Sequence, residues 1–466
     1  MRYISTRGRA EPAGFADVLL AGLAPDGGLY VPETWPSLTA EAIAAFAGRP
    51  YAEVAAAVLG RFTGEAVAAE ALEAICAEAY ATFAHPAVTP LTELAPGLWL
   101  QALHHGPTLA FKDVAMQLLA RLYEHVLTRA GANRRLTVVT ATSGDTGGAA
   151  VEALRGRSGV NLVVLFPEGR ISEVQRRFMT TVDDANVRCA AVAGDFDDCQ
   201  AVLKRLFADE AFRREVDLSG VNSINWARIA AQCVYYVTAA AALGAPHRPV
   251  RFAVPTGNFG DAYAGWVARR MGAPVERIVV ATNGNDILAR AFETGRYARG
   301  AARATQSPAM DIQVASNFER LYFEAVGRDP LETARAFRAF AETGAVDLPP
   351  AALAAMRAVF AGVAVDEDET ARTMLSVLNE TGQLIDPHTA VAVAAARRSA
   401  PAATPLVVLS TAHPAKFPDA VHGATGVRPE PPAQAAGLMT RPERFDRLPA
   451  DAESVKAYVR AFASGR

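Results

Sequence analysis

Residues His104–Asp113 read HHGPTLAFKD and place a lysine where a loop turns into a helix. The Gly106-Pro107 pair is typical of a turn, and apolar residues recur at helical spacing beyond residue 115. Lys112 therefore lies at a helix start, directly after the apolar Phe111. Apolar surroundings favour the neutral amine, which is a nucleophile that condenses with aldehydes. Taken alone, a lysine at a helix start is more often a solvated surface residue, so the rest of the chain has to decide.

The bulk composition is that of a large folded protein without a nucleic-acid or membrane partner. The chain has 466 residues, 51% hydrophobic and 20% charged, with a formal net charge of −3. This length predicts roughly three domain-sized units. The interleaved charges give no basic surface for nucleic acid or anionic lipid. The uncharged run 229–246 suits a buried helix better than a membrane span, and the N-terminus lacks the apolar core of a signal peptide.

The four cysteines are far apart and form no C-x-x-C motif. This spacing predicts neither a disulfide scaffold nor a zinc site, so no metal is expected. A reducing cytoplasm is the natural compartment for such a chain.

The pattern along the chain divides it into three parts. Residues 1–87 form an opening unit with a DGG turn and three helical patterns, and we expect it to be structural. From residue 88 to 425, strand and helix patterns alternate with short connections, which predicts an α/β fold with an open, mostly parallel sheet and helices on both faces. Residues 330–381 are predicted to be a helical insertion. Residues 426–466 are expected to form a surface strap and a last helix.

Three loops after predicted strands have unusual compositions, and ligands bind at such positions in open α/β sheets. The loop Thr140–Gly148 (TATSGDTGG) offers small hydroxyl residues and backbone N–H groups before a helix, which suits an anion but equally a helix cap. The loop Pro255–Asp261 (PTGNFGD) can wrap a phosphate, yet it matches neither nucleotide motif. The loop Ser410–Phe417 (STAHPAKF) adds two hydroxyls, a histidine and a second lysine.

A desolvated lysine, two anion loops and a late hydroxyl are together the requirements of pyridoxal 5′-phosphate. In these motifs the chain resembles the threonine synthase family. The segments that carry the resemblance are GLAPDGGLYVP (22–32), HGPTLAFKD (105–113), TSGDTG (142–147), NSIN (222–225), PTGNFGD (255–261) and TAHPAKF (411–417). Because these motifs are ordered and spread along the chain, the similarity extends from end to end.

The resemblance implies the pyridoxal-phosphate fold type II, which is tryptophan-synthase-β-like. It predicts two open, mostly parallel sheets with helices on both faces, plus an N-terminal α/β extension. Residues of about 135–245 would form a mobile subdomain of the catalytic core. Wider relatives often carry asparagine at the position of Asp145, and an aspartate there resembles the longer-chain threonine synthases.

The resemblance also implies roles for individual residues. Lys112 would hold the cofactor as a Schiff base, and Thr411 would hydrogen-bond the pyridine nitrogen. The cofactor phosphate would lie in the loop of Gly257, Asn258, Phe259, Gly260 and Asp261. The pocket for the substrate carboxylate and the 3′ oxygen of the cofactor would be lined by Ser143, Gly144, Asp145 and Thr146.

The implied reaction converts O-phospho-L-homoserine and water to L-threonine and phosphate, the last step of threonine biosynthesis. Lys112, once released, would be the base for the early proton transfers. The partner is a small-molecule substrate, and the chain would be a monomer or a small homo-oligomer.

The departing phosphate of the substrate needs cations that stabilise growing charge. Few cations lie in the motif loops besides Lys112. Arg228 and Lys416 are therefore expected to hold this phosphate, with Ser223 and Asn225 beside them.

Three other functions use some of the same features. A threonine-synthase-like phospholyase would release 2-oxobutyrate, ammonia and phosphate, and product analysis distinguishes it. The Asp145 loop, the opening unit and the AHPAKF segment weigh against a threonine or serine dehydratase. A non-catalytic phosphate- or nucleotide-binding protein would lack a visible chromophore, whereas a protein with a bound aldimine is yellow.

Overall fold

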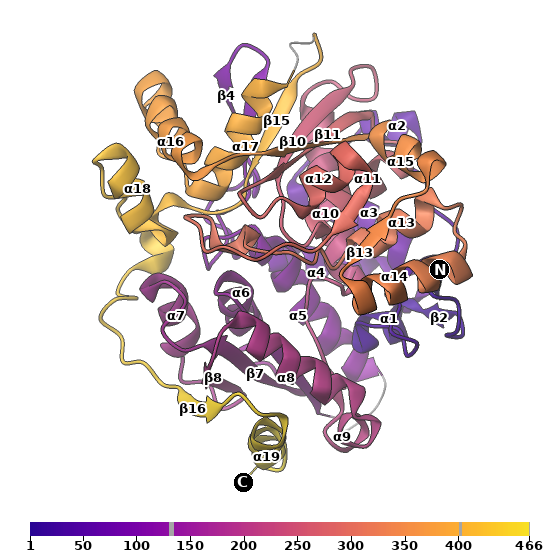
Figure 1. Ribbon diagram of the computed structural model, residues 1–466, viewed down its shortest axis with the longest axis vertical. Coiled ribbons are helices and arrows are strands. Elements are labelled where there is room, and N and C mark those ends of the chain that lie inside the picture. The colour runs from indigo at the N-terminus through magenta and orange to yellow at the C-terminus, as the bar shows by residue number, and fades with distance from the viewer. Residues whose placement is uncertain (130–134, 400–402, 466) are drawn as a thin grey trace.

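The computed structural model describes residues 1–129, 135–399 and 403–465, which form two bodies built on separate sheets (Figure 1). The first body contains a six-stranded sheet in the order β14-β11-β10-β15-β5-β4. Its strands are β4 (Leu91–Ala95), β5 (Leu98–Ala102), β10 (Val250–Pro255), β11 (Val275–Thr282), β14 (Phe360–Ala364) and β15 (Leu406–Ser410). The strands are parallel except for the antiparallel pair of β4 and β5.

The second body contains a parallel five-stranded sheet in the order β16-β8-β7-β6-β9. Its strands are β6 (Leu136–Ala141), β7 (Val160–Pro167), β8 (Val187–Ala193), β9 (Leu218–Ser219) and β16 (Asp446–Pro449). Both β6 and β7 are buried along their whole length. Such continuous apolar strands are typical of a parallel sheet that is covered on both faces.

Helices cover both faces of each sheet, so the expectation of two open, mostly parallel sheets is confirmed. On the second sheet, α6 (Asp145–Leu154) and α7 (Glu173–Thr180) share one apolar cluster, and α8 (Phe196–Ala208) and α19 (Ala452–Ala463) share the other. On the first sheet, α10 (Trp226–Ala242) and α11 (Gly260–Arg270) lie opposite α16 (Glu367–Thr381) and α17 (Pro387–Arg398). The remaining helices outside the N-terminal unit are α5 (Lys112–Arg129), α9 (Glu210–Glu215), α12 (Ile287–Thr294), α13 (Phe318–Ala325), α14 (Pro330–Thr343), α15 (Pro350–Arg357) and α18 (Pro418–Thr425).

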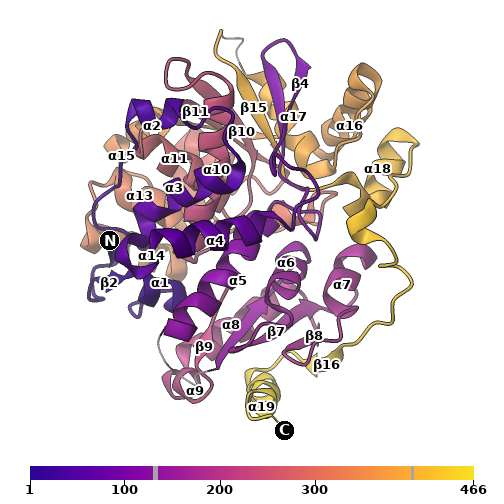
Figure 2. The same cartoon turned by 180° about the vertical axis from the view of Figure 1, so that it is seen from behind.

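The N-terminal unit is the expected α/β extension. Its sheet has the order β2-β1-β3 and is antiparallel. The elements are β1 (Arg2–Ser5), β2 (Ala13–Gly14), α1 (Phe15–Ala21), β3 (Tyr30–Pro32), α2 (Ala40–Ala44), α3 (Tyr51–Thr63) and α4 (Ala69–Tyr80). Helix α3 packs on α10 and α4 packs on α5, so the unit is part of the first body's core (Figure 2).

Two expected boundaries differ from the structure. Residues 330–381 are not only helical, because β13 (Ala345–Asp347) pairs with β12 (Arg296–Ala298) and β14 completes the first sheet. The expected subdomain of about 135–245 also includes α10, which packs against α3, α5 and α11 of the first body. Four strands of the second sheet, β6 to β9, lie within residues 136–219, and its fifth strand, β16, comes from the C-terminal segment.

That strap runs along the outside of the molecule from α18 on the first body to β16 and α19 on the second (Figures 1 and 2). The expectation for residues 426–466 was a surface strap and a last helix, and the structure has β16 and α19 in this part of the chain. None of the helices that the structure describes combines the length and apolar character needed to cross a membrane.

Helix α5 connects the two bodies, because it packs against α4 and α10 on one side and α6 on the other. Its first residue is Lys112. The loops that follow β6, β10 and β15 reach the same region, since the carboxyl ends of parallel strands share one edge of a sheet.

The close crossing of α10 and α11 generates a stability prediction. A Cβ atom at Gly265 of α11 would lie 2.7 Å from the buried Tyr236 ring and 3.0 Å from Ile278 Cδ1. Alanine favours a helix over glycine by about 1 kcal/mol, but overpacking a core costs about 1–3 kcal/mol. Gly265→Ala should therefore lower the free energy of unfolding, measured by chemical denaturation.

Gly60→Ala is the matched control, because Gly60 is an exposed glycine of α3 whose nearest neighbour to an added Cβ is Leu72 Cδ2 at 3.8 Å. This variant should be as stable as the parent or more stable. Equal effects of the two substitutions would contradict the packing argument.

Candidate active site

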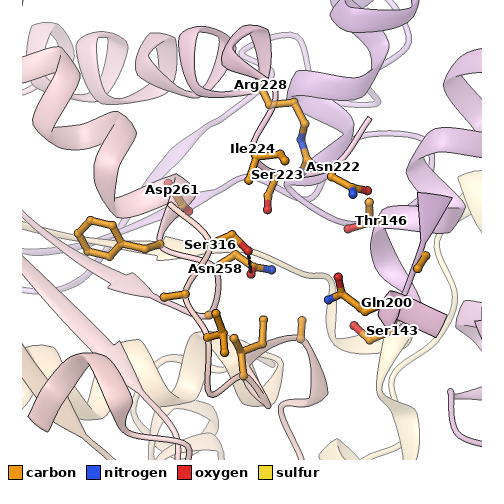
Figure 3. A pocket seen from close by; sticks show the side chains of 18 of the residues that line it. Ser143, Thr146, Gln200, Asn222, Ser223, Ile224, Arg228, Asn258, Asp261 and Ser316 are labelled. Atoms are coloured by element: carbon orange, nitrogen blue, oxygen red, sulfur yellow. Dashed lines mark hydrogen bonds between the residues drawn. The ribbon is translucent and has the colours of Figure 1, made fainter. Parts of the chain in front are cut away.

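A cavity of about 480 Å³ lies between the two bodies. In Figure 3, Ser143, Thr146 and Gln200 face Asn258 and Ser316 across it, with Arg228 and Ser223 at one end. The structure brings most of the predicted site residues to this cavity. They are Lys112, Ser143, Asp145, Thr146, Ser223, Arg228, Gly257, Asn258, Phe259, Gly260, Asp261 and Thr411.

Lys112 presents its amine in a largely buried setting, with 12% of the side chain exposed. Its Nζ lies 3.2 Å from Asp145 Oδ2. Burial lowers the pKa of the Lys112 ammonium; Asp145 opposes this effect, and the positive charges of Lys416 and Arg228 reinforce it. The neutral amine is the form that attacks an aldehyde, so this environment suits a Schiff-base lysine.

Asp145 stands in the first turn of α6, between two lysines. Lys416 Nζ lies 3.1 Å from its Oδ1, to which Gln175 also donates at 2.9 Å. Although burial opposes ionisation, Lys112 and Lys416 hold the pKa of the Asp145 carboxyl well below its usual range. Gly144 precedes it with φ of +130°, where a Cβ would overlap the Gln175 amide, so glycine is required there.

The loop Pro255–Asp261 fits a bound phosphate. It links β10 to the N-terminus of α11, where unpaired backbone N–H groups and the helix dipole favour an anion. A Cβ at Gly257 would lie 2.7 Å from Ala309 O, so any larger residue at this position would collide with the neighbouring backbone. Phe259 adopts φ of +63°, and Asn317 donates to Asn258 O, which holds this turn in place.

Asp261 closes the loop but is directed toward α10. Its carboxylate accepts hydrogen bonds from Tyr235 and Tyr236, and burial raises its pKa to about 6. These contacts fix the start of α11 against α10. We therefore regard Asp261 as a support of the phosphate loop.

Thr411 is joined to the lysine segment by the backbone. Phe111 N donates to Thr411 O at 2.8 Å, and Ala110 forms a bridge with Ala412. The Thr411 side chain is 5% exposed and lines the cavity. A hydroxyl is thus held next to the helix that begins with Lys112.

Of the four residues expected at the substrate phosphate, Arg228 and Ser223 line the cavity. Arg228 is 2% exposed and donates to Val221 O at 3.1 Å, while its Nε has no hydrogen-bond partner in the described part of the chain. Burial lowers the pKa of this guanidinium to about 10. The guanidinium therefore keeps hydrogen-bonding capacity beside the cavity, which suits an anion.

Asn225 and Lys416 are placed differently from that expectation. Asn225 caps α10 and donates to Leu19 O and Tyr123 Oη. Lys416 is completely buried; it pairs with Asp145 and donates to Thr108 O at 2.7 Å. Neither residue lines the cavity, and Gly144 does not line it either.

Sequence reasoning missed several residues of the cavity wall. Asn222 belongs to the NSIN motif but was not singled out; it accepts a hydrogen bond from Thr140 Oγ1. His388 pairs through Nδ1 with Asp386 and accepts from Ala309 N through Nε2. Arg7 of the N-terminal unit also lines the cavity, so this unit is not purely structural.

Three family models match successive parts of the chain. They are described as threonine synthase N terminus (residues 2–80), pyridoxal-phosphate dependent enzyme (residues 83–362) and threonine synthase, C-terminal (residues 389–459). The threonine synthase of Pseudomonas aeruginosa is 49% identical over 98% of this chain and 98% of its own length.

Solved structures agree with these matches. A pyridoxal-phosphate-bound threonine synthase from Brucella melitensis has a TM-score of 0.95 and 52% identity, covering 99% of each chain. The threonine synthase from yeast has a TM-score of 0.92 and 35% identity, covering 100% of this chain and 99% of its own. Since these similarities extend over the whole length and the cavity presents a buried lysine opposite a phosphate loop, the chain belongs to the threonine synthase family of pyridoxal-phosphate-dependent enzymes of fold type II.

Proposed function

We propose that this chain converts O-phospho-L-homoserine and water to L-threonine and phosphate. The observation that supports this function best is a cavity that combines one buried amine with two separate groups suited to anions. The Gly257–Gly260 loop would form one anion site and the buried Arg228 guanidinium would form the other. A substrate that carries its own phosphate needs the second site in addition to that of the cofactor.

The residues of the first site fit pyridoxal phosphate. Lys112 would bond to its aldehyde carbon, the Gly257–Gly260 loop would hold its phosphate, and Thr411 would bond its ring nitrogen. When bound, the cofactor supplies an electron sink that makes the Cα proton of an amino acid removable. Ser143 and Asp145 would lie toward its 3′ oxygen, and Thr146 would lie toward the substrate carboxylate.

Lys112 would also move the proton at Cα. Burial lowers the pKa of the Lys112 ammonium, which makes its amine a competent base for this proton.

Arg228 would bind the phosphate of the substrate, with Ser223 and Asn222 beside it. A guanidinium that becomes paired as charge grows on the leaving oxygen stabilises that step more than it stabilises the bound substrate. A phospholyase would use the same groups, but the relatives reported above are synthases and do not favour it. Product analysis tests the distinction: threonine is expected, and 2-oxobutyrate with ammonia would contradict the proposal.

We further propose a cytoplasmic enzyme that is a monomer or a small homo-oligomer. All four cysteines are free and buried, which suits a reducing compartment.

Lys112→Ala should abolish threonine formation and the visible absorbance of the bound cofactor, because Lys204, which also lines the cavity, lies on α8 and does not pair with Asp145 as Lys112 does. Borohydride reduction followed by peptide mapping measures the covalent link. The chain has only three other lysines, Lys204, Lys416 and Lys456. A reduced cofactor on any of these in the variant would contradict the assignment.

Thr411→Val should retain the cofactor but lower kcat at least about tenfold. The ground state loses one hydrogen bond, about 0.5–1.5 kcal/mol, and the loss should grow as electron density reaches the ring. Thr411→Ser is the control and should keep most of the activity. Cofactor content and kcat are measured on the same samples, and an unchanged kcat for the valine variant would remove this role.

Arg228→Gln should raise KM for phosphohomoserine and weaken inhibition by inorganic phosphate by about 10–100-fold. The range corresponds to a charged hydrogen bond of about 1.5–3 kcal/mol. Arg214→Gln on α9 is the control, because Arg214 is exposed and pairs only with Glu210 among the described residues. If the Arg228 variant keeps its cofactor spectrum and binds phosphate like the parent, the substrate phosphate is held elsewhere.

A further inference from the structure

Lys112, Asp145 and Lys416 form a row in which one carboxylate lies between two ammonium groups. Asp145 Oδ2 is 3.2 Å from Lys112 Nζ, and Oδ1 is 3.1 Å from Lys416 Nζ. The exposed fractions of the three side chains are 12%, 4% and 0%. Lys416, which we expected to bind the substrate phosphate, is therefore buried behind the cavity wall.

Lys416 is held by more than this ion pair. Its Nζ donates to Thr108 O at 2.7 Å and lies 5.2 Å from the centre of the Phe178 ring. Thr108 is fixed in turn, because its N and Oγ1 both donate to Asp113 in the first turn of α5. Lys416 thus joins the loop before Lys112 to the carboxylate in front of it.

A second cation beside Asp145 matters for the protonation state of Lys112. A buried carboxylate paired with Lys112 alone would hold this amine as an ammonium ion, which cannot attack an aldehyde. When Lys112 then bonded to the cofactor, the carboxylate would lose its ammonium partner in a buried site, at a large cost. Lys416, which takes no part in the chemistry, keeps Asp145 paired in both states and reduces its hold on the Lys112 ammonium ion.

We propose that Lys416 is a positioning residue, which balances the negative charge of Asp145 and thereby sets how readily the Lys112 nitrogen gives up its proton. The proposal rests on the cofactor role of Lys112 proposed above. Lys416 acts through Asp145 and touches neither cofactor nor substrate.

The charged groups around the row support the same direction. The charge of Lys416 lowers the pKa of Lys112, and Arg228 on α10 acts likewise. His388 on α17 faces Asp145, and Asp113 on α5 faces Lys416. Without Lys416, the full negative charge of Asp145 should act on Lys112. The nitrogen of Lys112 should therefore lose its proton at a higher pH.

The test is a spectroscopic pH titration of the holoenzyme, which follows the absorbance of the cofactor bonded to Lys112. Lys416→Met and Lys416→Gln should each move the midpoint upward by about one pH unit or more. Glutamine keeps a donor for Thr108 O, so this variant preserves a structural contact while removing the charge. Lys416→Arg keeps the charge and should titrate like the parent. Lys456→Met on α19 is the remote control.

Combining Lys416→Gln with Asp145→Asn tests whether Lys416 shifts the titration midpoint through Asp145. The upward shift caused by Lys416→Gln should fall to less than half in the Asp145→Asn background. An undiminished shift would show that Lys416 does not act through Asp145 and would overturn the proposal.

Two further results would overturn it. One is a midpoint that stays at the parent value in both uncharged variants while stability falls, which is the outcome of a purely structural lysine. The other is an arginine variant that shifts as far as the glutamine variant. A parent enzyme without a visible cofactor band would instead contradict the proposed role of Lys112, so the two failures are distinguishable.

Discussion

The ion pairs of Asp145 are the contact on which the relation of the two bodies depends. Asp145 belongs to the second body, and both of its lysine partners belong to the first. A carboxylate this deeply buried requires cations, and its partners cannot be exchanged for water. The second sheet is therefore held so that the TSGDTG loop closes one wall of the cavity, opposite the loop that suits the cofactor phosphate.

The fold brings these groups together through the ends of its strands. Asp145 follows β6, Lys416 follows β15, and Lys112 begins the helix that packs between the bodies. This is why motifs hundreds of residues apart could be assigned to one site from the sequence. Strand and helix patterns predicted an open, mostly parallel sheet, and the family resemblance added the second sheet. Loop composition predicted the cofactor before any family resemblance was used.

The direction of individual side chains could not be predicted in the same way. Asn225 and Lys416 stand in motifs that face the site, but their partners, Leu19 and Thr108, lie far away in the sequence. Motif membership gives position on the chain, and only the fold decides which neighbour a side chain meets. The strand β14 was missed for a related reason: FAGVA is too short and too rich in small residues to be distinguished from the helices around it.

The two proposed anion sites differ in chemistry, and the difference fits how long each anion would stay. A cofactor phosphate remains through many turnovers, so backbone groups fixed by Phe259 and Asn317 can hold it without a mobile charge. The substrate phosphate must bind, take on charge as its bond breaks, and leave. A guanidinium anchored on Val221 O suits this task, because the anchored donor holds it in place while its positive charge offsets the charge on the oxygen. The burial of Lys416 against Asp145 keeps its ammonium group out of the cavity, so Lys416 does not add to the hold on the departing phosphate.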